Sequence, residues 1–174
     1  MSESMWDITI KNKVDVITPD EIVEEQCRHL STKTDGRVLG KVSRYDGPTI
    51  GYIYNLSSLA LDPFKKKNIN SPDSLNEIDN DSRFAFDFSI TSISTPHYKY
   101  RVMILVYELD CYPTAIDLDD DIASEIGMSP QIMCKSEEEF KITLRKILGS
   151  PKISRVVNFL NSATLREERR AEAV

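Results

Sequence analysis

The chain has 174 residues, of which 40% are hydrophobic and 29% charged, and its net charge is -6. This length suffices for one packed domain without metals or disulfides, and the composition excludes wholesale disorder. The three cysteines form no CxxC pair, so neither a disulfide scaffold nor a structural zinc site is indicated. No apolar run approaches the roughly 20 residues of a membrane span, and residues 1–13 lack the apolar core of a signal peptide. We therefore expect a soluble, cytoplasmic protein that makes no membrane contact.

The N-terminal part contains a strong helix-start signal and a turn signal. Thr18 at the cap, Pro19 at the first helical position and Glu21 three residues after the cap predict a helix over 19–33. Further on, Asp46-Gly47 separates two β-prone runs, because Gly accepts the positive φ that a tight turn requires. We interpret these runs, residues 37–45 and 50–56, as a hairpin.

Two other segments of the N-terminal half are predicted from their composition or from the alternation of apolar and polar residues. Residues 6–10 alternate briefly, which is typical of a short edge strand or an ordered arm. Residues 65–82 are crowded with Asn, Asp, Ser and Lys and hold few apolar side chains. Such a segment buries too little surface to order itself, so we expect a mobile loop there.

The middle of the chain predicts the centre of a sheet. Residues 102–107 form the longest unbroken apolar run, which is typical of a strand covered on both faces. Before it, residues 83–93 alternate strictly, and this pattern predicts a half-buried strand with Asp87 and Ser89 toward solvent. The four-residue break at 94–97 favours antiparallel pairing of the two strands.

The C-terminal third predicts one further strand and three helices. Residues 114–118 are the next strand, and residues 118–127 read as a short helix capped by Asp119. Ser136 and Ser150 then open two amphipathic helices, which we expect to form a tight pair. Residues 165–174 are charged and helix-prone, so this tail should fray or extend the last helix into solvent.

Together these patterns predict an α+β fold: an N-terminal helix, a curved and mainly antiparallel sheet of four to six strands, and a C-terminal helix pair packed on the sheet. The domain would span residues 1–164, with the charged tail at 165–174. Because the central strand is apolar on both faces, we expect the helices to cover one face, and the first helix, self-association or a partner to cover the other.

Charge is distributed unevenly along the second half. From Glu108 to Glu139 there are ten acids and one base, whereas from Phe140 to Leu165 there are five bases and no acid. The bases would suit phosphate contact, but the acidic segment would repel nucleic acid, so binding to nucleic acid is disfavoured. The same bases would instead face the acidic segment within the fold.

The densest group of charges is the acidic cluster at Asp117, Asp119, Asp120 and Asp121. Three of its carboxylates, at Asp117, Asp119 and Asp121, have the spacing of the first ligands of a calcium loop, but the later Gly and Glu of an EF-hand are missing. A metal-dependent hydrolase or nuclease that uses these three residues is the enzyme alternative. The competing interpretation is that Asp119 caps the following helix and that its neighbours stabilise the helix dipole.

Other catalytic templates are absent from the sequence. There is no phosphate-binding glycine loop and no nucleophile motif, and Cys27 and His29 point to different sides of their helix. We therefore expect no cofactor, no metal and no catalytic residues. The preferred hypothesis is a non-catalytic protein-interaction module of bacterial type, accessory or immunity-like. It would bind a basic protein partner through an acidic surface that consists of Asp110, Tyr112, Asp117, Asp119, Asp120, Asp121 and Glu125.

Overall fold

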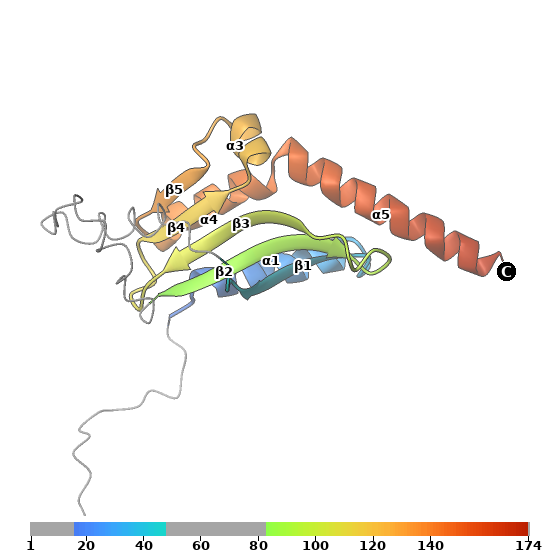
Figure 1. The fold of residues 1–174 in the computed structure, drawn as a ribbon, viewed down its shortest axis with the longest axis horizontal. Helices are drawn as coiled ribbons and strands as arrows, with labels where there is room; N and C mark the ends of the chain where they lie inside the picture. Colours follow the sequence, from blue (N-terminus) through green and yellow to red (C-terminus); the bar gives the residue numbers. More distant parts are fainter. Residues whose placement is uncertain (1–15, 48–82, 174) are drawn as a thin grey trace, which may run out of the picture.

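The computed structural model of the protein describes residues 16–47 and 83–173. Helices and strands in this part of the chain follow one another as shown in Figure 1. In chain order they are α1 (Pro19–Lys33), β1 (Val38–Arg44), β2 (Phe84–Ser92), β3 (Tyr100–Tyr107), β4 (Thr114–Leu118), α3 (Asp120–Ile126), β5 (Gln131–Cys134), α4 (Glu137–Leu148) and α5 (Pro151–Glu172). The fold is α+β, as the sequence predicts.

The five strands form one antiparallel sheet in the order β1-β2-β3-β4-β5. The central strand is β3, whose Leu105 lies opposite Phe86 of β2 and opposite Ile116 of β4. Every residue from Val102 to Tyr107 is buried. The prediction that this run is the sheet centre and is covered on both faces is therefore confirmed.

One face of the sheet packs against the helices and forms the main core. All four helices contribute to it, and α1 and α4 lie behind the sheet in Figure 1. Among the fully buried side chains are Phe88 and Leu105 of the sheet, Phe140 and Ile147 of α4, and Leu160 of α5. These are the apolar positions that helical and strand periodicity select.

The opposite face of the sheet holds a smaller apolar cluster. Ile104, Val106 and Ala115 are its buried members, and the described residues packed against them are Tyr45, Ala85 and Met133. These neighbours belong to the sheet itself and to the residue that follows β1. The cluster therefore lies on the face away from the main core.

The expectation that Asp87 and Ser89 point to solvent is wrong. Asp87 is 3% exposed and Ser89 is 1% exposed. The reason is the β2–β3 hairpin, because Lys99 and Arg101 of its second arm reach Asp87 and cover it. Strand alternation correctly predicts the apolar face but does not reveal that charged side chains shield the other one.

The predicted helix starts are confirmed by their hydrogen bonds. The backbone N–H of Thr18 donates to Glu21 Oε2 at 2.9 Å, and the hydroxyls of Ser136 and Ser150 each accept from a backbone N–H three residues on. Gly127 ends α3 in the left-handed region at φ +65°, a conformation that glycine adopts without steric cost.

The structure contains one strand that the sequence does not predict, and three predicted segments lie outside the described residues. β5 is an extra strand of only four residues, too short for its alternation to stand out. The last helix continues through the charged tail, where Glu168 accepts a hydrogen bond from Arg37 Nε. The expected strands at 6–10 and 50–56 and the expected loop at 65–82 lie outside the described residues. In the described ranges, none of the helices has the length and apolarity needed to cross a lipid bilayer.

Candidate functional site

A recess of about 280 Å³ opens where β4 leads into α3. The middle of β3, the end of β4 and the first residue of α3 contribute most of its walls, and Tyr45 contributes from the segment after β1. The described residues that line it are Tyr45, Arg101, Val102, Met103, Ile104, Asp117, Leu118, Asp119 and Asp120. Three members of the acidic cluster thus share this recess with one base. We call it the acidic recess.

Asp119 has a structural task within the recess. One of its carboxylate oxygens accepts hydrogen bonds from the backbone N–H groups of Asp121 and Ile122, both at 3.1 Å, and so caps α3. The same oxygen accepts a hydrogen bond from the hydroxyl of Tyr100 at 2.9 Å. Burial, together with this bond, raises the pKa of Tyr100. One oxygen of Asp119 is therefore engaged by the fold, and the predicted role of Asp119 as a helix cap is confirmed.

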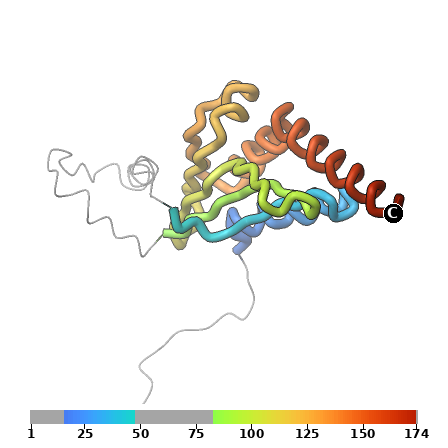
Figure 2. Tube along the Cα trace, turned by 45° about the vertical axis from the view of Figure 1, so that its right-hand side comes forward, coloured from blue at the N-terminus to red at the C-terminus, as the bar shows by residue number. Residues whose placement is uncertain are grey.

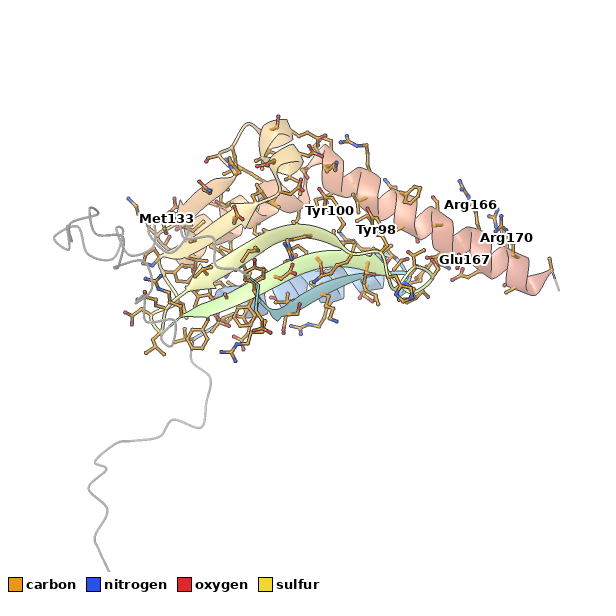
Figure 3. The ribbon with its side chains drawn as sticks, viewed as in Figure 1. Tyr98, Tyr100, Met133, Arg166, Glu167 and Arg170 are labelled. Carbon is orange, nitrogen blue, oxygen red and sulfur yellow. The ribbon has the colours of Figure 1, made fainter. Side chains whose placement is uncertain are left out.

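The outer part of the acidic segment is neutralised by α5. Lys152 Nζ donates to Asp121 Oδ2 at 2.5 Å, and Arg155 pairs with Glu125. These hydrogen bonds lower the pKa of both carboxyls. Lys152 also lies 5.8 Å from the ring centre of Tyr100, which is on β3 beside the first turns of α5 (Figure 3). The basic segment thus faces part of the acidic segment within the fold.

Asp117 and Asp120 remain without an ion pair among the residues that the structure describes. Asp117 lies at the end of β4 and is partly buried, whereas Asp120 is exposed at the start of α3. Burial raises the pKa of Asp117, the charge of Asp120 raises it further, and Arg101 opposes both effects. Ionisation of Asp117 is therefore less favourable than that of an aspartate in water.

This environment predicts that Asp117→Asn stabilises the protein in a pH-dependent way. The folded-state pKa of Asp117 is above its unfolded-state value, so the folded form holds its proton more tightly. The carboxyl therefore favours folding below the unfolded pKa and loses that effect as the pH rises through the folded pKa. We expect the free energy of unfolding of Asp117→Asn to exceed that of the wild type by more at pH 7 than at about pH 4. Urea denaturation at both pH values measures this gap, and an equal gap at the two would contradict it.

Arg101 is a residue of the recess that the sequence analysis missed. Its guanidinium donates to Asp87 Oδ2 at 3.3 Å and lies 5.6 Å from the ring centre of Tyr45. Lys99 Nζ donates to the same oxygen at 2.7 Å. The hairpin register sets Arg101 opposite Ser89, two residues from Asp87 on the same strand, and this register is the signal that could have identified the group.

The structure divides the predicted acidic surface between two places. Asp110 is exposed in the turn before β4, at the opposite end of that strand from Asp117. Tyr112 packs against Phe140 of the core, with ring centres 6.4 Å apart, and its buried hydroxyl has no hydrogen-bond partner among the described residues. Of the seven residues assigned to the surface, Asp117, Asp119 and Asp120 line the recess. Asp121 and Glu125 lie next to it on α3, paired with α5.

The alternative metal site is not assembled in this arrangement. The three carboxylates of Asp117, Asp119 and Asp121 have separate surroundings, namely burial, a helix cap and an ion pair. Within residues 16–47 and 83–173, no group of three His, Cys, Asp or Glu side chains is placed to hold a metal ion.

Comparison of the chain with models of known protein families, with curated proteins and with solved structures finds no match.

Proposed function

We propose that this protein is a non-catalytic interaction module, of the accessory or immunity-like kind, that binds a basic segment of another protein through the acidic recess. One observation carries the proposal: Asp117 and Asp120 have no ion pair in the described chain, whereas their neighbours Asp121 and Glu125 do. A bound Lys or Arg side chain would supply the missing cation.

The recess suits a long basic side chain in shape and polarity. Ile104 and the ring of Tyr45 provide apolar wall for an aliphatic stem, while Asp117, Asp119 and Asp120 provide carboxylates for its charged end. Arg101 does not reverse the charge of the recess, because its guanidinium is held by Asp87 and three carboxylates oppose one base. A cation bound there would also relieve the unfavourable ionisation of Asp117.

Calorimetric titration with a hexa-arginine peptide at low salt tests the proposal. We expect Asp117→Asn/Asp120→Asn to weaken binding about tenfold or more, which corresponds to about 1.4 kcal/mol. The matched control is Asp110→Asn/Glu138→Gln, which changes the net charge equally at two exposed acids outside the recess.

The control variant distinguishes binding at the acidic recess from general electrostatic attraction. Equal weakening in both double variants would show that the peptide responds only to net charge, and this outcome would overturn the recess as the site. The Asp117→Asn substitution adds a second distinction, since it should weaken binding and at the same time stabilise the fold. A residue with a purely structural role would not show that combination.

A further inference from the structure

The outward side of α5 carries a row of basic side chains that the acidic recess does not use. Exposed residues follow each other there at intervals of four and three positions, so they lie along one side of the helix. This basic stripe consists of Arg155, Phe159, Ser162, Arg166, Arg169 and Arg170. Phe159 is 67% exposed, which is unusual for a large aromatic side chain without a partner.

Two acids of α5, Glu167 and Glu168, lie outside the stripe. Arg166 and Arg170 point away from the sheet in Figure 3, while Glu167 lies on the other side of the helix. Glu168 faces the body of the protein and binds Arg37. In the part of the chain that the structure describes, Arg166, Arg169 and Arg170 make no ion pair. The C-terminal part of the stripe therefore presents three exposed arginines, whereas Arg155 at its other end is paired with Glu125.

The bases at the start of α5 already bind carboxylates. At its N-terminal end, Lys152 and Arg155 pair with Asp121 and Glu125 of α3 in the same molecule. Beyond this point α5 runs away from α3 and its C-terminal part extends past the end of the sheet (Figures 1 and 2). The pairing therefore stops where α5 leaves α3, and the basic stripe continues without its acidic counterpart.

We propose that the basic stripe binds the acidic recess of a second copy of this chain, with Arg166 and Arg170 of one copy paired with Asp117 and Asp120 of the next. This inference rests on the proposed function, because it names the partner of the same recess. Arg166 and Arg170 are neighbours one helical turn apart, so both can reach one site. Among the described residues, Asp117 and Asp120 are acids of the recess that have no ion pair and do not cap a helix.

Charge favours the recess of a second copy over other partners of the basic stripe. Two stripes packed against each other would oppose arginine to arginine, which disfavours a symmetric α5–α5 dimer. A nucleic acid would meet the repulsion of a protein whose net charge is -6. A stripe that binds a recess is a heterologous contact, so copies join head to tail into rings or open chains.

Sedimentation of the full chain over a range of concentrations tests the inference. We expect the wild type to form oligomers at about 50 mM salt and to dissociate at about 500 mM, because the Debye length falls from about 14 Å to about 4 Å. Arg166→Glu/Arg170→Glu and Asp117→Lys/Asp120→Lys should each be monomeric alone. Mixed in equal amounts they should associate, because each variant then offers the charge that the other lacks.

Two further variants serve as controls for the sedimentation experiment. Arg166→Gln/Arg170→Gln removes the charges without placing acids in the last turns of α5, and it should also be monomeric. Arg28→Glu/Lys146→Glu reverses two exposed bases on α1 and α4, and it should oligomerise like the wild type.

The results distinguish failure of the self-association proposal from failure of the proposed function. A monomeric wild type, or association that persists in Arg166→Gln/Arg170→Gln, overturns the second copy as the occupant. If the wild type is monomeric but still binds hexa-arginine through Asp117 and Asp120, the proposed function stands with another basic partner. If the recess variants change neither peptide binding nor association, both proposals fail.

Discussion

Lys99→Ala/Arg101→Ala is expected to lower the free energy of unfolding by about 3 kcal/mol, since it leaves the carboxylate of Asp87 buried without a counter-ion. Asp87 is 3% exposed, and its Oδ2 accepts hydrogen bonds from Lys99 and Arg101. Within residues 16–47 and 83–173, its Oδ1 already has no hydrogen-bond partner. The expected cost is at the lower end for a broken buried pair, because both bases are about half exposed and water can replace them. Urea denaturation at neutral pH measures it.

A triple variant tests whether the buried charge of Asp87 causes this loss of stability. Adding Asp87→Asn to the double variant removes the buried charge and should restore most of the lost stability. If the triple variant is no more stable than the double, the loss comes from the packing of the Lys99 and Arg101 stems. The double variant also removes the base that lines the acidic recess, so any folded fraction should bind hexa-arginine more tightly.

The parts of the fold that the sequence predicts are those with local causes. The start of α1 follows from Thr18, Pro19 and Glu21, whose interactions span three residues. β3 follows from an apolar run that only a position inside the sheet would bury. β5 was missed, since a strand of four residues offers only two positions on each face.

The candidate site is harder to predict because its charges are set by distant partners. Asp121 meets Lys152, which is 31 positions away, so the sequence alone does not show which acids are neutralised. Asp110 and Asp117 are near in sequence, yet Asp110 lies in the turn before β4 and Asp117 near the far end of that strand. Burial of Asp87 depends on a hairpin register that includes a bulge between Phe88 and Ser89.

The core on the helical face is expected to be the most sensitive part of the molecule. Phe140 of α4 is fully buried and packs against the ring of Tyr112. Phe140→Ala should lower the free energy of unfolding by about 3–5 kcal/mol, because it removes a large apolar side chain and leaves a cavity that its neighbours fill only in part. Denaturant unfolding followed by fluorescence and by circular dichroism measures the loss.

Ile142 is the matched control on the same helix, since its side chain is 50% exposed. Ile142→Ala should change the free energy of unfolding by about 0.5 kcal/mol or less. Because Phe140 lies in the main core and does not line the acidic recess, the folded fraction of Phe140→Ala should bind hexa-arginine as the wild type does. Weaker binding by the folded protein would show that the recess is shaped by the helical core, whereas unchanged binding would show that its shape does not depend on Phe140.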